Sequence, residues 1–404
     1  MKYWKTLGMK LRKIGMMNTR RGWILMLYKL MCKDRCVYTL DRDTLKATIE
    51  CPELMPVNLG VIPGQELQCF QDWCATRVLP LDRKYAKRIL NALGLPQSST
   101  AAEKTKIALS YYAVSLQDCY WVCTDKSTKV WKDVSVFSNH LSDVIQLVAL
   151  QGSSIAIRNK NLQLGHELST DGTYAKTWAR QENGIVLYKA GEGNDEVCRE
   201  CLASKILDFT NVDHVTYTKG NFEGTEVSIS KCMTDENRSR VTYAALKQGL
   251  GQDALSKVIA LDPENYYKML VVTFLIGNID LHDGNWGIFV NPDTGEWLNV
   301  HPLFDFNNAF DESFYYTDDG GNSLPDMEVK WNEAFEDYDY EFKNTLLSAA
   351  QDAMQRCDFR INQIPDEVFE SKKLRDQFYH RCELLDIVFG LGNLSDVKGL
   401  NTFS

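Results

Sequence analysis

Two short segments in the second half of the chain contain the residue types that phosphoryl transfer requires. The first, Asn-Ile-Asp-Leu-His-Asp-Gly-Asn at 278–285, follows an apolar helix predicted over 266–276. On such a loop, the carboxylate of Asp280 would accept or orient the proton of an attacking hydroxyl. The side-chain oxygen of Asn285 suits Mg²⁺, a hard cation that prefers oxygen ligands. The two side chains are therefore predicted to divide the work between proton handling and metal binding.

The second segment, Pro-Leu-Phe-Asp-Phe-Asn at 302–307, places Asp305 after a strand predicted over 297–300. We expect this carboxylate to be the main metal ligand, like the aspartate of the metal-binding motif in protein kinases. Phosphoryl transfer also needs a cradle for the ATP phosphates and a cation that contacts them. The chain offers candidates for both, in the order found in kinases.

The pattern Asp-x-His-x-x-Asn, then a pair of strands, then Pro-Leu-Phe-Asp resembles the catalytic and metal-binding segments of the HipA-like serine/threonine protein kinases. The resemblance implies that Asp280 is the catalytic aspartate, with His282 in the same loop. It also implies that Asn285 and Asp305 are the Mg²⁺ ligands. The family shares a two-lobed architecture with protein and phosphoinositide kinases, and some of its members are growth-arresting toxins.

The residues upstream are similar to the same family. The strand Gly-Ile-Val-Leu-Tyr-Lys at 184–189 ends in Lys189, which resembles the lysine that binds the ATP phosphates. The segment 194–203 resembles the opening of the helix that carries the lysine's partner. An alignment on its final Leu-Ala places Glu196 at the glutamate that pairs with Lys189. Glu200, one helical turn further on, is the alternative.

The segment 169–178 resembles the phosphate-binding hairpin of the family, which usually reads Gly-Ala-Gln-x-Lys. Gly172 and Lys176 keep the spacing, whereas Tyr174 stands where glutamine is usual. Backbone N–H groups in such a loop can cradle phosphate whatever the side chains are. Ser169 falls at the position of a phosphorylatable serine in some members, which suggests self-regulation. The resemblance implies these nucleotide-binding residues: Gly172, Thr173, Lys176, Lys189, Lys231 and Met233.

The overall pattern predicts an α+β fold in which a kinase-like part follows an amino-terminal α/β region. That kinase-like part has two lobes, a small mixed β lobe and a larger helical lobe. Turn signals at Asp171-Gly172 and Asn183-Gly184 indicate hairpins. The predicted domains are an accessory region 1–150, a small lobe 151–235 and a large lobe 236–404. Short strands are predicted within 37–49 and over 154–158, 176–180, 184–190 and 226–231. Helices are predicted over 83–93, 101–113, 195–207, 243–259, 263–277, 333–356 and 366–390.

Composition limits the class of protein. The chain has 404 residues, 44% of them hydrophobic and 25% charged, and a net charge of −9, which argues against nucleic-acid binding through bulk charge. The 12 scattered cysteines suggest reduced thiols in a cytoplasmic protein, and Cys198 and Cys201 are read as small apolar residues of a helix. The apolar run near residue 25 is too short to span a membrane. The basic amino terminus suggests a frayed, solvated helix, or contact with an acidic partner, nucleic acid or lipid.

Three classes of function remain open at this stage. The leading class is a kinase that uses ATP and Mg²⁺ to phosphorylate serine or threonine in a protein substrate, acting as a toxin or effector and bound at 1–150 by an antitoxin or regulatory protein. The second is a pseudokinase that binds nucleotide or protein without turnover. The third is a metal-dependent hydrolase built on Asp280, His282, Asp283 and Asp305. The acidic stretch 311–340 is either a solvated loop or a substrate-facing segment that favours basic peptides.

Overall fold

The computed structural model describes most of the segments that the sequence singles out. The described residues are 27–97, 100–139, 141, 143–153, 169–170, 172–193, 195–278, 280–310, 363–369 and 371–389. The basic residues before Leu27, the predicted strand 154–158, the acidic stretch 311–340 and the predicted helix 333–356 lie outside them.

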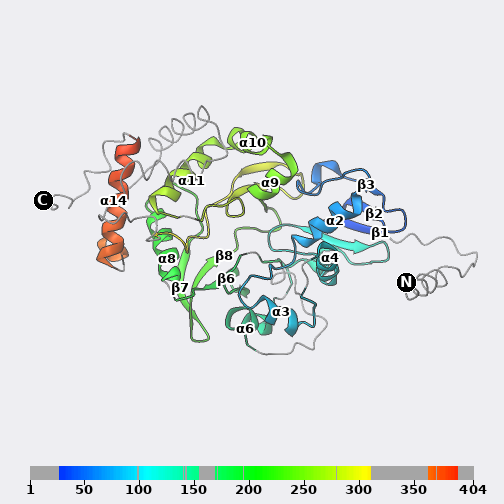
Figure 1. Cartoon of the computed structure of the whole chain (residues 1–404), viewed down its shortest axis with the longest axis horizontal. Helices are drawn as coiled ribbons and strands as arrows, with labels where there is room; N and C mark the ends of the chain where they lie inside the picture. The colour runs from blue at the N-terminus through cyan, green and yellow to red at the C-terminus, as the bar shows by residue number, and fades with distance from the viewer. Residues whose placement is uncertain are drawn as a thin grey trace, which may run out of the picture.

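In the part of the chain that the structure describes, three antiparallel sheets with helices packed around them form the predicted α+β fold (Figure 1). The first sheet has the strand order β3-β2-β1-β4 and lies at one end of the molecule beside α2 and α4. Its strands are β1 (Leu27–Cys32), β2 (Arg35–Asp41), β3 (Ala47–Ile49) and β4 (Tyr120–Thr124). The helices of this region are α2 (Glu66–Ala75), α3 (Ala86–Ala92), α4 (Ala101–Ser110), α5 (Trp131–Val134) and α6 (Asp143–Gln151).

The second sheet has the order β5-β6-β8-β7 and carries the candidate phosphate-binding lysines. Its strands are β5 (Lys176–Gln181), β6 (Gly184–Ala190), β7 (Tyr217–Phe222) and β8 (Thr225–Lys231). Lys176 on β5 is the cross-strand partner of Lys189 on β6, so the register brings these two cations together. Helix α8 (Glu196–Leu207) packs against β7 and β8.

The third sheet, β11-β10-β9, joins the helical part of the chain. Its strands are β9 (Ser239–Thr242), β10 (Gly287–Val290) and β11 (Trp297–Val300). The helices that follow β9 are α9 (Tyr243–Leu250), α10 (Asp253–Leu261), α11 (Pro263–Leu275) and, further along the chain, α14 (Lys372–Phe389). These helices share one hydrophobic core with α8 and the third sheet, through side chains such as Leu202, Val271 and Phe378.

Two predictions about secondary structure were wrong. The helix predicted over 243–259 is two helices, because Gly251 ends α9 with φ at +62°, a conformation that glycine adopts without steric cost. The described part of the basic amino-terminal end is strand β1, not a helix. β1 lies between β2 and β4 and buries Leu30 and Cys32, so tertiary pairing outweighs local preference.

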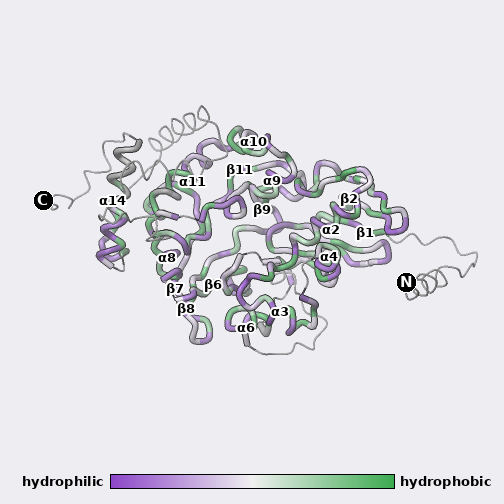
Figure 2. Tube along the Cα trace, viewed as in Figure 1, coloured by the Kyte–Doolittle hydropathy of each residue, from purple (hydrophilic) through white to green (hydrophobic). Residues whose placement is uncertain are grey.

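A separate hydrophobic core lies under the first sheet, where Tyr38, Phe70 and Trp121 are fully buried. Hydrophobic and hydrophilic residues alternate along the described elements (Figure 2). Within the described residues, no helix combines the length and the apolar character needed to cross a membrane. Every cysteine of the described part is a free thiol, and Cys198 and Cys201 lie on α8 as predicted. The domain boundaries at 150 and 235 stay predictions.

Candidate phosphate-transfer site

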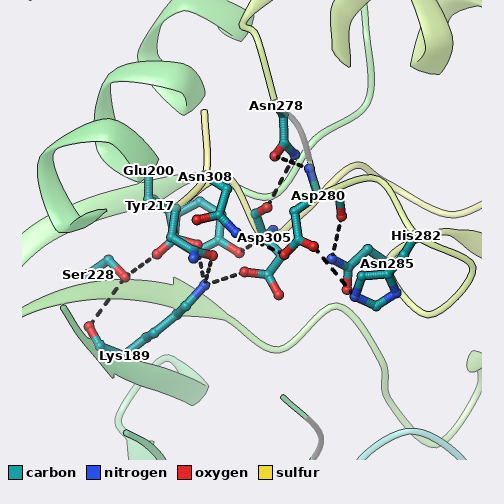
Figure 3. Close-up of polar contacts among 11 residues, drawn as sticks. Lys189, Glu200, Tyr217, Ser228, Asn278, Asp280, His282, Asn285, Asp305 and Asn308 are labelled. Atoms are coloured by element: carbon teal, nitrogen blue, oxygen red, sulfur yellow. Dashed lines mark hydrogen bonds and ion pairs between the residues drawn. The ribbon is translucent and has the colours of Figure 1, made fainter. Parts of the chain in front are cut away.

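Lys189 lies at the centre of the candidate site, where three separate parts of the chain meet (Figure 3). Its side chain extends from β6 and is only 5% exposed. The ammonium group donates to Glu200 Oε1 on α8 at 3.1 Å, and it also contacts Asp305 Oδ1 and Asn307 Oδ1. Because a buried cation is stable only when it is paired, this arrangement fixes both carboxylates relative to the strand.

The charges of the site determine its protonation. Burial alone would lower the pKa of Lys189, but the carboxylates of Asp305 and Glu200 outweigh burial and raise the pKa above its ordinary value. Burial alone would raise the pKa of Asp305, but the charges of Lys189 and then Lys176 lower it below the ordinary range. Near neutral pH the lysine is therefore cationic and the aspartate anionic.

The glutamate that pairs with Lys189 is Glu200, so the assignment of Glu196 was wrong and the alternative was right. Glu200 is 1% exposed, and its second oxygen accepts a hydrogen bond of 2.5 Å from Ser228 Oγ on β8. Glu196 begins α8, and its carboxylate accepts from the backbone N–H of Glu192 at 3.2 Å. The two glutamates lie one turn apart on the same helix, and only the packing of α8 on the sheet selects between them.

Asp305 is held in a strained turn after β11. Its φ of +67° is in the left-handed region, which is uncommon for a residue other than glycine. Its backbone N–H donates to Tyr217 Oη at 3.1 Å, and its carbonyl accepts from Asn278 Nδ2 at 3.3 Å. These bonds to β7 and to the predicted catalytic loop support the strained backbone, which aims the carboxylate at Lys189.

The predicted catalytic loop, 278–285, contains Asp280, which is half buried. Asn308 Nδ2 donates to Asp280 Oδ2 at 3.0 Å, and His282 Nε2 lies 3.9 Å from Oδ1. Burial, and then the negative charge of Asp305, raise the pKa of the Asp280 carboxyl. Such a carboxylate is oriented by its amide neighbour and has a greater affinity for a proton than an ordinary aspartate.

Asn285 and His282 also hold this loop in shape. Asn285 Nδ2 donates to the carbonyl of Asp280 at 2.8 Å, so the amide nitrogen is used within the loop. The backbone N–H of Gly284 donates to His282 Nδ1 at 3.0 Å. His282 therefore accepts a hydrogen bond that holds the shape of its own loop.

The predicted phosphate hairpin lies over Lys189. The ring of Tyr174 is centred 5.4 Å from the Lys189 ammonium, a cation–π distance. Gly172 has φ at +89°, a conformation that favours glycine, and a Cβ there would displace the end of the Lys176 side chain. The accessory region supports this hairpin: the backbone N–H of Lys84 donates to the Thr173 carbonyl at 2.7 Å.

Sequence reasoning missed several residues of the site. Asn307, Asn308 and Tyr217 contact the predicted residues directly, and Asn307 and Asn308 follow the predicted Asp305 so closely that their polar side chains were a usable signal. The buried guanidinium of Arg83 contacts the Lys176 carbonyl from the accessory region. Nothing in the local sequence of Arg83 or Tyr217 indicates these contacts.

A cavity of about 480 Å³ lies at this site, and we call it the central cavity. Its volume lies in the range of small-molecule sites. Lys231, the last residue of β8, and Met233, just after it, line the cavity, whereas Glu196 and Lys189 do not. The predicted residues that line it are Gly172, Thr173, Lys176, Lys231, Met233, Asp280, Asn285 and Asp305. Ser115, Leu116 and Gln117 of the accessory region complete its wall.

The fold of the described residues is similar to that of the HipA kinases. HipA of Shewanella oneidensis MR-1, solved with HipB and operator DNA, matches with a TM-score of 0.53 and 13% identity over 92% of this chain and 99% of that chain. CtkA, a proinflammatory kinase of Helicobacter pylori, matches 54% of this chain and 92% of its own at 15% identity, and its TM-score of 0.36 supports no inference. No family model and no curated protein matches the sequence.

Proposed function

We propose that the protein is a kinase that uses ATP and Mg²⁺ to phosphorylate serine or threonine hydroxyls of a protein substrate. The observation that supports this function best is the buried lysine between two carboxylates, Lys189 with Glu200 and Asp305, beside the loop of Asp280 and Asn285. The proposed small lobe contains the second sheet and α8, and the proposed large lobe contains the helices that follow.

Each residue of the site has a role in the proposed reaction. The substrate oxygen forms a bond to the γ-phosphorus of ATP while the bond to the β-phosphate oxygen breaks, which leaves ADP. The hydroxyl proton passes to Asp280, whose raised pKa suits a proton acceptor. Lys189 and Lys176, adjacent across β5 and β6, would bind the phosphate oxygens. Glu200 keeps Lys189 in position.

The residues present fit a magnesium ion. Mg²⁺ in such sites is bound by one or two protein ligands together with substrate phosphates, and it neutralises charge on the phosphate oxygens. The anionic Asp305 and the side-chain oxygen of Asn285 would be the protein ligands. Within the described residues, no cluster of three or more His, Cys, Asp or Glu side chains forms a metal site, which disfavours the hydrolase alternative.

The accessory region is proposed to carry a regulatory partner as well as to complete the site. HipA of Shewanella oneidensis was solved in complex with HipB and operator DNA, so a regulatory protein for this chain is a reasonable proposal. Gln117 of the accessory region accepts a hydrogen bond of 2.7 Å from the backbone N–H of Arg240. Because Gln117 also lines the central cavity, a partner bound beside Gln117 would lie next to the wall of that cavity.

The test is a transfer assay with γ-labelled ATP and Mg²⁺, run with and without a generic protein substrate. The wild type is compared with Asp280→Ala and Asp305→Ala. Label transfer that both variants lose supports the proposal, because a proton-accepting group is worth about 10²–10⁴ in rate. Nucleotide binding without transfer to any substrate would support the pseudokinase alternative, and absence of nucleotide binding would reject both.

A further inference from the structure

Asn307 is a buried residue of the candidate site to which the proposed reaction so far gives no role. It follows Asp305 by two positions, and it lines the central cavity although its side chain is almost fully buried, with a residue exposure of 1%. Its side-chain oxygen accepts a hydrogen bond from the Lys189 ammonium. Because an ammonium group only donates hydrogen bonds, the oxygen end of the amide must make this contact. The orientation of the amide is therefore set, and Nδ2 is the end that Lys189 does not use.

The nitrogen of the same amide is a buried donor that lacks an acceptor. Among the described residues, no group accepts a hydrogen bond from Asn307 Nδ2. The Tyr174 hydroxyl is a neighbour, since burial raises the pKa of this phenol and the Asn307 side chain opposes the rise, yet Nδ2 does not reach hydrogen-bond geometry with it. Buried donors in folded proteins are nearly always paired, because an unpaired one has lost its water without compensation. A ligand in the central cavity would supply the acceptor.

The groups around Asn307 indicate which part of a ligand would meet this donor. Lys176 lines the same cavity and is the cross-strand partner of Lys189, whose ammonium contacts Asn307 directly. The turn at Gly172, in the predicted phosphate hairpin, also lines the cavity. Asp305, the proposed Mg²⁺ ligand, lies two residues before Asn307 in the chain. These are the surroundings of a phosphate group, whose charged oxygens are strong hydrogen-bond acceptors.

We propose that Asn307 is a binding residue for the phosphate chain of the nucleotide. Its Nδ2 donates to a phosphate oxygen while its oxygen keeps the hydrogen bond from Lys189. The contact with the lysine also polarises the amide, which strengthens its N–H groups as donors. This role rests on the proposed kinase function and adds a residue to its nucleotide site.

The test uses two variants of Asn307 that keep roughly its shape. Asn307→Asp retains an oxygen for Lys189 but exchanges the N–H donor for a second, negatively charged oxygen. Asn307→Leu removes the donor without adding charge, and Lys189 keeps Glu200 and Asp305 as partners. Dissociation constants for ATP with Mg²⁺ and for adenosine are measured by calorimetry, without a protein substrate.

The matched control is Asn221→Asp, which adds the same charge away from the cavity. Asn221 is an exposed residue of β7 that does not line the central cavity, and its oxygen accepts from the Gly224 N–H, a role that aspartate retains. We expect Asn307→Leu to weaken ATP binding about 5- to 10-fold, the value of one hydrogen bond. Asn307→Asp should weaken it by more than about 10-fold, because it also places a negative charge beside the phosphate. Adenosine, which has no phosphate, should bind all the variants as it binds the wild type.

Three results would overturn the role of Asn307: an unchanged or higher ATP affinity in Asn307→Asp, equal losses of ATP and adenosine affinity, or equal effects of Asn307→Asp and Asn221→Asp. The transfer assay separates this role from the proposed function. If the wild type binds ATP but transfers no phosphate, the kinase proposal fails, while a loss of ATP affinity confined to the Asn307 variants still supports the phosphate contact. If the wild type transfers phosphate and Asn307→Asp binds ATP normally, only the phosphate contact is rejected. A wild type that binds no ATP rejects both.

Discussion

The pairing of Lys189 with Glu200, and not with Glu196, gives a sharp prediction about stability. Removal of one partner from a buried ion pair costs about 3–5 kcal/mol, because the other charge is left in a medium of low polarity. In Glu200→Gln the lysine keeps Asp305 and Asn307 as partners, so we expect a loss of about 2–3 kcal/mol in the free energy of unfolding. The same helix provides the control. Glu196→Gln retains an oxygen that accepts from the Glu192 N–H, and we expect it to cost less than Glu200→Gln.

Both variants are measured by urea unfolding, followed by circular dichroism and tryptophan fluorescence, beside KM for ATP in the transfer assay. Glu200→Gln should lower the urea midpoint and raise KM for ATP, because Lys189 is no longer held in position. Glu196→Gln should leave both close to the wild type. Equal losses in the two variants, or a larger loss in Glu196→Gln, would refute the assignment and return the role to Glu196.

Three further predictions concern the reaction and are tested on the same protein. Asp280→Asn should lower kcat by about 10²–10⁴ without changing ATP affinity measured by calorimetry. In the wild type, kcat should fall as the pH drops through the raised pKa of Asp280, so the acidic limb of the pH profile lies at higher pH than for an ordinary aspartate. An acidic limb at the ordinary position would contradict the argument from burial. Asp305→Asn should abolish the Mg²⁺ dependence of ATP binding, and binding that still depends on Mg²⁺ would exclude Asp305 as a ligand. Tyr174→Ala should raise KM for ATP about 5-fold, because it loses a contact of about 1 kcal/mol with Lys189. Tyr174→Phe keeps the ring, so its KM for ATP should stay near that of the wild type.

The chemistry-bearing residues were predictable because each lies in a local pattern. Gly172 and Lys176 follow a turn signal, Lys189 ends an apolar strand, and Asp280 and Asn285 share one short loop. The structure brings Gly172, Lys176, Asp280 and Asn285 to one cavity, and Lys189 lies buried behind its wall in contact with Asp305, which lines it. The choice between Glu196 and Glu200 was not predictable with the same certainty. The two residues lie on one helix a single turn apart, and a small change of spacing in an alignment exchanges them.

The accessory region shows a different limit. Its strands within 37–49 were predicted, but nothing in the sequence showed that Gln117 and Arg83 reach the site. The side chain of Glu236 accepts hydrogen bonds from Trp131 at 3.0 Å and from Ser135 at 2.9 Å, across the boundary that the sequence placed near residue 150. Such contacts join residues more than a hundred positions apart, so no local pattern records them.

The sequence by itself determined the α+β class, most of the strands and helices, and the order of the candidate catalytic residues, because periodicity and turn chemistry act over a few residues. Only the tertiary structure decided which glutamate pairs with Lys189 and that Asp305 adopts a left-handed turn. These features depend on strand register and on the packing of segments distant in the chain. Their free energy comes from burial and charge pairing that exist only once the chain has folded.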